Sequence, residues 1–180
     1  MENAYLESAL RLFRYYKSLA DKSIERVPAD KIHFQYNEDS NSLALIVRHM
    51  SGNMLSRWTD FLTTDGEKSW RNRDSEFETP DWDKKALTEH WEKGWTTLFA
   101  AIEPLKSSDL DTLVYIRNEG HTVMEAINRQ IAHYAYHVGQ IVFLAKAMTE
   151  EWESLSIARN KSKDFNAEKF SQDKGKKHFV

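Results

Sequence analysis

Asn-Arg-Gln-Ile-Ala-His-Tyr-Ala-Tyr-His-Val-Gly-Gln, residues 128–140, is the stretch from which the fold of this chain is best worked out. It holds His133 and His137, four residues apart in a strongly helical run. On an α-helix, a separation of four residues leaves two side chains about 40° apart on one face. Two imidazoles on successive turns can therefore bind one metal ion, although histidines four apart also occur in helices without any metal. The pair predicts a metal site only if the chain supplies a third ligand and a bundle of helices to hold it.

The spacing of apolar residues predicts that four helices make up most of the chain. Thr122-Val123-Met124-Glu125 matches a capping box, in which Thr122 and Glu125 satisfy free amides at the start of a helix. The last helix is therefore expected to begin there and to continue to about residue 149. Apolar side chains three and four residues apart predict the other three helices, at residues 4–26, from Asn41-Ser42 to a stop at Asp65-Gly66, and at residues 83–103.

Two connections between these helices stand out. Residues 67–83 form a long polar loop, and a loop of this length in a compact domain is often functional. Its alternating charges, Trp70 and Phe77 fit either a contact surface for a partner or a solvated loop pinned by those two aromatic side chains. Residues 112–117 are rich in β-forming side chains and predict a short extended crossing or a small hairpin before the last helix. The predicted fold class is all-α.

The composition indicates one helical domain followed by a basic tail. The 180 residues include six glycines and three prolines, few enough to favour long helices over a turn-rich β fold. One domain is expected at residues 1–158, since a chain of this length can bury a single core. Residues 159–177 hold seven Lys or Arg against three Asp or Glu. The tail at residues 159–180 is therefore basic, and its end is expected to be partly disordered.

Charge and residue types argue against several classes of protein. A net charge of -3 does not favour nucleic acid or an anionic membrane as a partner. The absence of cysteine excludes disulfides, thiolate ligands and a cysteine nucleophile. The first residues are acidic where a secretion signal needs basic ones, and no apolar stretch approaches the roughly 18 residues of a membrane span. A cytoplasmic location is expected.

His49 is the candidate for the third ligand. It lies in the middle of the second expected helix among apolar residues, with Asn53 and Ser56 within about 40° on the same face. Metal sites of helical bundles are built from inward side chains on facing helices, so His49 can join His133 and His137. Three imidazoles leave at least one metal coordination position open for water or substrate, as in catalytic sites. The alternative is that His49 is a buried imidazole with a hydrogen bond to Ser56 or Asn53.

Two groups of residues carry a resemblance to a known family. They are Asn41-Ser42, residues 46–53, Arg57-Trp58 and residues 65–68 in the first half, and residues 128–130 with His133, Tyr134, Tyr136, His137 and residues 139–141 in the second. With these motifs the chain resembles the DinB/YfiT-like superfamily over about residues 1–166, and within it a bacterial subfamily of unknown function. The resemblance implies an up-down-down-up four-helix bundle, commonly dimeric. It also implies a metal triad of His49, His133 and His137.

The resemblance implies three possible functions. Related proteins include thiol-dependent transferases and isomerases as well as a metal-dependent hydrolase, and others have no known activity. The first expectation is a thiol S-transferase that uses a divalent metal, Zn or Ni, and a bacillithiol-like low-molecular-weight thiol. Asn53, Arg129 and Gln140 are the expected substrate-pocket residues, with Arg129 and Gln140 available for a carboxylate of the cosubstrate. The alternatives are a metal-dependent hydrolase and a non-catalytic, metal-binding dimeric module of the stress response. A homodimer is the expected assembly for all three functions.

Overall fold

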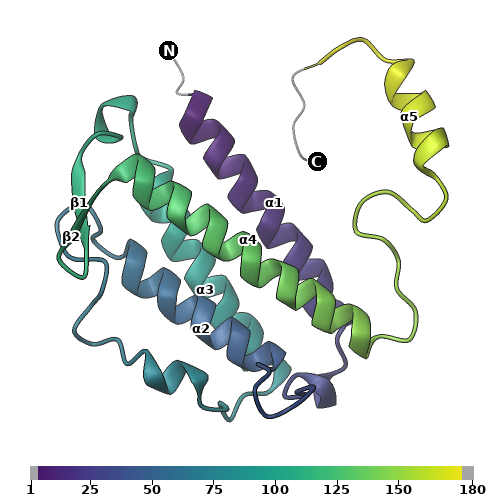
Figure 1. Cartoon of the computed structure of the whole chain (residues 1–180), viewed down its shortest axis with the longest axis horizontal. Coiled ribbons are helices and arrows are strands. Elements are labelled where there is room, and N and C mark those ends of the chain that lie inside the picture. The colour runs from purple at the N-terminus through teal and green to yellow at the C-terminus, as the bar shows by residue number, and fades with distance from the viewer. Residues whose placement is uncertain (1–3, 176–180) are drawn as a thin grey trace.

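Four long helices and a small antiparallel hairpin form the body of the chain in the computed structural model, which describes residues 4–175 (Figure 1). In chain order the elements are α1 (Ala4–Arg26), η1 (Ala29–Lys31), α2 (Leu43–Trp58), η2 (Asp74–Phe77), α3 (Lys84–Ile102), η3 (Ser107–Asp109), β1 (Leu113–Ile116), β2 (Glu119–Thr122), α4 (Val123–Met148) and α5 (Ser162–Phe170). The predicted all-α class is confirmed, with one small sheet added. Helix α1 packs along α4, α2 packs along α3, and α2 also contacts α4.

The core between these helices is rich in aromatic side chains, and one of them fixes α4 against α2 beside the histidines. Tyr134 is fully buried and packs against Phe13 of α1, with ring centroids 6.0 Å apart. Its hydroxyl accepts a hydrogen bond from Trp58 Nε1 at 3.1 Å and donates one to Asn53 Oδ1 at 3.0 Å. A buried tyrosine needs such partners for its hydroxyl group. Because Tyr134 follows His133 directly, these bonds also fix where His133 and His137 lie along the axis of α2.

The predicted helix ends are confirmed for three of the four long helices. The start of α3 is capped by Asp83, whose carboxylate accepts from the amide of Ala86 at 2.7 Å. Thr122 and Glu125 form the predicted capping box at the start of α4. Each cap satisfies backbone amides that have no partner within the helix.

Helix α2 ends earlier than predicted, at Trp58 rather than near Gly66. Asp60 adopts a left-handed backbone conformation with φ 46°, which terminates the helical hydrogen-bonding pattern. Thr63 and Thr64 then bond through both amide and hydroxyl to the carbonyl of Asp60. Short polar side chains that bond to nearby backbone favour turns over helix, so this cluster overrides the apolar spacing of Phe61 and Leu62.

The predicted extended segment is one strand of a hairpin. Strands β1 and β2 pair antiparallel, from Leu113 opposite Thr122 to Ile116 opposite Glu119. The turn between them consists of Arg117 and Asn118, with φ angles of 56° and 61°. Positive φ at both positions matches the two-residue turn that suits the twist of a hairpin.

Helix α5 was not predicted from the sequence. It lies in the basic tail, away from the four long helices (Figure 1), and none of its residues is buried. Part of the tail end that was expected to be disordered, residues 176–180, lies outside the described residues. Within residues 4–175, no helix has both the length and the apolar character that crossing a membrane requires.

Candidate metal centre

The histidine pair of α4 and the histidine of α2 come together at one point. The Nε2 atom of His133 lies 3.4 Å from Nε2 of His49 and 3.1 Å from Nε2 of His137. One ligand atom from each of the three side chains lies within 4.8 Å of the other two. A tetrahedral zinc ion with nitrogen ligands at ~2.0–2.1 Å separates these nitrogens by roughly 3.3 Å. The spacing of the three imidazoles therefore fits a divalent metal ion.

The second nitrogen of each ring is held by an oxygen atom, which decides which nitrogen is free for a metal. These contacts are His49 Nδ1 to Glu76 Oε2 at 2.9 Å, His133 Nδ1 to Gln130 Oε1 at 3.4 Å, and His137 Nδ1 to Gln140 Oε1 at 2.7 Å. A carboxylate has no proton to give, so His49 donates from Nδ1 and keeps a lone pair on Nε2. With amide oxygens facing the other two rings, all three Nε2 lone pairs point toward one another. A cation stabilises this arrangement, and ligating histidines usually carry such partners on the second nitrogen.

The protonation of the α4 histidines also suits a metal site. Burial, together with the neighbouring His137 and His49, lowers the pKa of His133 to about 3. Burial lowers the pKa of His137 as well, against the opposing effect of its bond to Gln140. Both rings are therefore neutral near pH 7, which is the form that binds metal.

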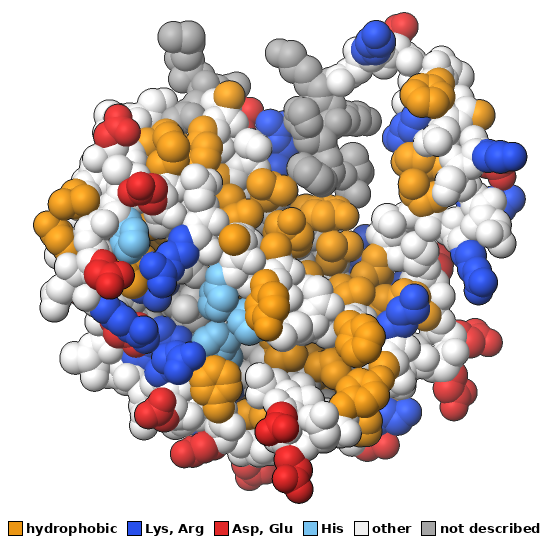
Figure 2. Space-filling model, in the orientation of Figure 1, with side chains coloured by type: hydrophobic (Ala, Val, Ile, Leu, Met, Phe, Trp, Pro, Cys, Tyr) orange, Lys and Arg blue, Asp and Glu red, His pale blue; other side chains and the backbone are white. Residues whose placement is uncertain are grey.

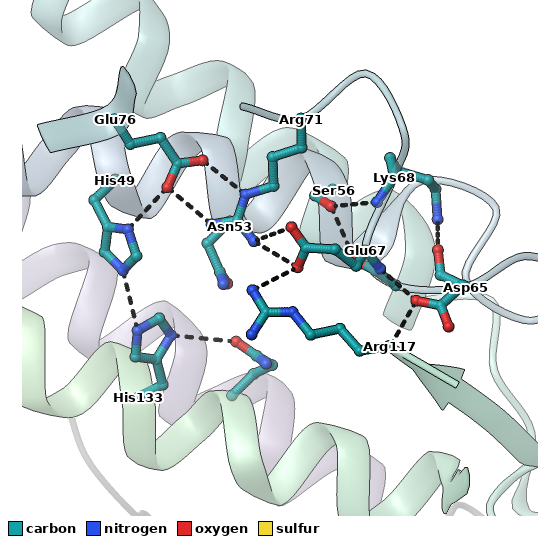
Figure 3. Close-up of polar contacts among 12 residues, drawn as sticks. His49, Asn53, Ser56, Asp65, Glu67, Lys68, Arg71, Glu76, Arg117 and His133 are labelled. Atoms are coloured by element: carbon teal, nitrogen blue, oxygen red, sulfur yellow. Dashed lines mark hydrogen bonds and ion pairs between the residues drawn. The ribbon is translucent and has the colours of Figure 1, made fainter. Parts of the chain in front are cut away.

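The carboxylate behind His49 belongs to a buried chain of charges in the loop after α2 (Figure 3). Glu76 Oε1 and Oε2 accept from Arg71 Nε at 2.7 Å and Nη2 at 2.8 Å, and Arg71 Nη1 also contacts Glu67 at 3.2 Å. The side chains of Arg71 and Glu76 are only 3% and 7% exposed. Burial alone would raise the pKa of Glu76, but the bonds from His49 and Arg71 outweigh it and hold that pKa below its usual value. Glu76 is thus ionised and fixed in place.

Of the two aromatic side chains expected to pin this loop, only Phe77 does so in the described structure. Trp70 is 59% exposed and does not pin the loop, whereas the ring of Phe77 stacks on His49 with centroids 5.1 Å apart. Glu76 and Arg71 were not predicted as site residues, and they make the loop part of the histidine site. Nor does His49 bond to Ser56 or Asn53, since its Nδ1 bonds to Glu76.

A glycine in α2 makes room for Glu76. A Cβ atom added at Gly52 would overlap Oε1 of Glu76, and it would lie 2.9 Å from the carboxyl carbon. Glycine in a helix costs roughly 1 kcal/mol relative to alanine, so its place one turn from His49 needs a reason of this kind.

Gly52→Ala is expected to lower the metal affinity about tenfold while leaving the helix intact or more stable. The added methyl group displaces Glu76 from His49, and outer-shell partners of metal ligands typically contribute about 10- to 100-fold in affinity. Competition with a chromogenic zinc chelator measures the change. Gly139→Ala in α4 is the matched control, because a Cβ there meets no atom within 4 Å. Equal affinity of the two variants would contradict a role for Glu76.

Three further residues were predicted to line the substrate pocket, and they lie in different places. Asn53 and Arg129 line a pocket of about 250 Å³ that also reaches His49 and His133. Gln140 instead bonds to His137 within α4 and lines a separate hollow beside Tyr36 and Phe143. The structure therefore brings Asn53 and Arg129 to the open side of the histidine cluster and gives Gln140 a supporting position.

Fold and site together define an all-α protein with a three-histidine cluster that could hold a metal ion. Residues 1–161 match the model of a family described as "Protein of unknown function (DUF1572)". Because this match covers most of the chain, the protein belongs to the DUF1572 family. A comparison with curated proteins found no similar sequence. The function must therefore be argued from the site.

Proposed function

We propose that this protein is a divalent-metal-dependent enzyme of the DinB/YfiT type that transfers a low-molecular-weight thiol to an electrophile. The metal would be held by His49, His133 and His137, with Zn or Ni as the expected ion. One observation carries the proposal: through His49 and His133, the cluster of three imidazoles adjoins a pocket that arginines line, with no carboxylate among its described lining residues. Such a site binds an anionic small molecule and activates a nucleophile without a protein base.

The open side of the cluster argues for catalysis. Among the described residues, the ligand group consists of three histidines with no fourth protein ligand, and a pocket adjoins His49 and His133. Structural zinc sites have four protein ligands, whereas catalytic sites leave one position open. The alternative of a non-catalytic metal-binding module therefore has less support.

The position of the carboxylates favours thiol transfer over hydrolysis. A metal-dependent hydrolase needs a general base beside the bound water. Glu76 contacts Nδ1 of His49, on the side of the ring away from the Nε2 cluster, and it is held by Arg71. Glu67 is bound by Arg71 and Arg117. Neither carboxylate is free to serve as that base.

The proposed chemistry requires little from the protein beyond binding and orientation. A divalent cation in the site would lower the pKa of a bound thiol, so that thiolate forms at neutral pH and the proton passes to solvent. The sulfur then forms a bond to the electrophilic carbon while the bond to the leaving group breaks, and the leaving group departs with the electron pair. Arg129 lies where it can bind an acidic group of the cosubstrate, and Asn53 lies beside His49 in the same pocket.

The same proposal includes the finer fold and assembly. The four long helices would be the up-down-down-up bundle of the DinB/YfiT-like superfamily, and two copies would form a cytoplasmic homodimer. The DUF1572 match, the pairing of α1 with α4 and of α2 with α3, and the origin of the histidines from α2 and α4 support the superfamily. Light scattering of the purified protein tests the dimer.

The thiol-transfer activity is tested on protein purified without a polyhistidine tag and loaded with Zn²⁺ or Ni²⁺. The protein is incubated with bacillithiol and an alkyl halide, and the conjugate is measured by mass spectrometry. Conjugate is expected to form faster with the loaded protein than with the free metal or with His137→Ala. Rates equal to both controls would rule out transfer of this thiol.

A further inference from the structure

The pocket beside the histidines is strongly basic. Five arginines line it: Arg57, Arg71, Arg73, Arg117 and Arg129. None of the residues that line it within the described chain is Asp or Glu. Figure 2 shows basic side chains grouped next to histidine side chains on the face that it draws. We call this cavity, of about 250 Å³, the arginine pocket.

Carboxylates of the described residues balance only part of the positive charge of the arginine pocket. The ion pairs of these arginines within residues 4–175 involve two carboxylates, Glu76 with Arg71 and Glu67 with Arg71 and Arg117. Arg73 packs over the ring of Phe77 instead. The five guanidinium groups therefore exceed their carboxylate partners by three. Because an arginine side chain stays protonated in proteins, the excess charge persists at any physiological pH.

Arg57 has the least satisfied side chain of the five. It lies in the last turn of α2 and is only 7% exposed. Its Nε and Nη1 atoms are buried, and neither has a hydrogen-bond partner in the part of the chain that the structure describes. A buried charge without a partner is unfavourable, and it is normally found opposite an ion of the other sign. Arg57 lines the arginine pocket, so an anion bound there would supply that partner.

The fold also positions Arg117 toward this pocket from the tip of the hairpin. The carboxylate of Asp65 accepts hydrogen bonds from the amides of Arg117 and Asn118, both at 2.8 Å. The Arg117 side chain then extends to Glu67, 3.3 Å away, on the side of the histidines (Figure 3). The arginines come from α2, the following loop, the hairpin turn and α4. Four separate elements thus bring positive charge to one small cavity.

We propose that the arginine pocket binds a group with two negative charges, a phosphate monoester or two neighbouring carboxylates, on the small molecule that reaches the histidines. Guanidinium groups bind both through paired hydrogen bonds to two oxygens. The volume suits a group of this size. The inference deepens the proposed function by naming the charge of the substrate or cosubstrate, but anion binding itself needs no metal.

The test uses the full-length protein freed of metal with a chelator. Inorganic phosphate, succinate and acetate are titrated at matched ionic strength and followed by calorimetry. Phosphate, succinate or both should bind at least tenfold more tightly than acetate, and the stronger of the two identifies the chemistry. If neither phosphate nor succinate binds more tightly than acetate, the proposal is overturned.

Variants then assign the binding to the arginine pocket. Arg57→Met, which removes the guanidinium group and keeps an unbranched apolar stem, and Arg129→Gln on the exposed face of α4 should each weaken binding at least tenfold. Arg159→Gln, the same change in the exposed tail, should bind as the wild type does. Wild-type affinity in both pocket variants would refute the assignment.

One more variant separates this proposal from the proposed function. His137→Ala removes the one histidine of the cluster that does not line the arginine pocket, and this variant should keep its affinity for phosphate or succinate. If thiol transfer is absent while the dianions bind and the arginine variants lose them, the pocket assignment stands and the enzymatic proposal fails.

Discussion

His133→Ala is expected to remove most of the metal affinity of the protein. His133 is the central ligand, since its Nε2 lies 3.4 Å from that of His49 and 3.1 Å from that of His137. Binding energies of about 10–16 kcal/mol for four-ligand zinc sites correspond to roughly 2.5–4 kcal/mol per ligand. Loss of one ligand then weakens binding about 100- to 1,000-fold.

Thermal unfolding measures this loss directly. Metal at 1,000 times its Kd stabilises the folded state by about 4 kcal/mol, which raises the Tm of a domain of this size by roughly 8–16 °C. The wild type should show this rise with Zn²⁺ or Ni²⁺, and His133→Ala should not. His90→Ala serves as the control, because His90 lies in α3 and stacks on Trp82 outside the cluster. A variant that retains the full rise in Tm would show that the ion binds elsewhere.

His133 also offers the cleanest of the three substitutions. His49 holds Glu76 and stacks on Phe77, so its removal would disturb the loop after α2 as well as the site. Apart from its contacts with the other two histidines, the His133 ring is held by a long hydrogen bond to Gln130, at 3.4 Å. A change in metal binding by His133→Ala can therefore be separated from a change in the fold.

The long helices could be predicted because their determinants are local. Residues three and four apart share a helix face, and caps such as Thr122 with Glu125 lie within one turn. The predicted end of α2 was wrong for the same reason. The apolar spacing continues through Phe61, but the left-handed backbone conformation of Asp60 ends the helix. The backbone conformation of Asp60 and its bonds from Thr63 and Thr64 leave no periodic signal in the sequence.

The site could be predicted only in part. The spacing of His133 and His137 is local, and His49 followed from its place on a facing helix. Glu76 reaches His49 across 27 positions, from a loop without periodicity, so no pattern connects the two. Gly52 was the available signal, because a glycine inside a helix and next to a candidate ligand indicates that another group approaches closely. Of the five arginines that line the arginine pocket, only Arg129 was predicted, because the five come from four separate elements.

Glu76→Ala is expected to destabilise the protein and weaken metal binding together. The substitution leaves Arg71, whose side chain is 3% exposed, without its main partner. Breaking a buried ion pair from one side costs about 3–5 kcal/mol, which lowers the Tm of a domain of this size by roughly 6–20 °C. It also removes the acceptor that fixes Nδ1 of His49, so metal affinity should fall about 10- to 100-fold.

The double variant Arg71→Met with Glu76→Leu distinguishes these two effects. Replacing both members of a buried ion pair with apolar side chains is often neutral for stability, so the Tm should return close to the wild-type value. The metal affinity should stay low, because no acceptor remains for His49. Glu76→Gln should give the opposite result, a lower Tm with the metal affinity retained. Its amide oxygen can still accept from His49 Nδ1, but its NH₂ group faces Arg71, which offers only donors. If the double variant recovered both stability and affinity, Glu76 would act only by holding the loop; recovery of stability alone assigns Glu76 to the orientation of His49.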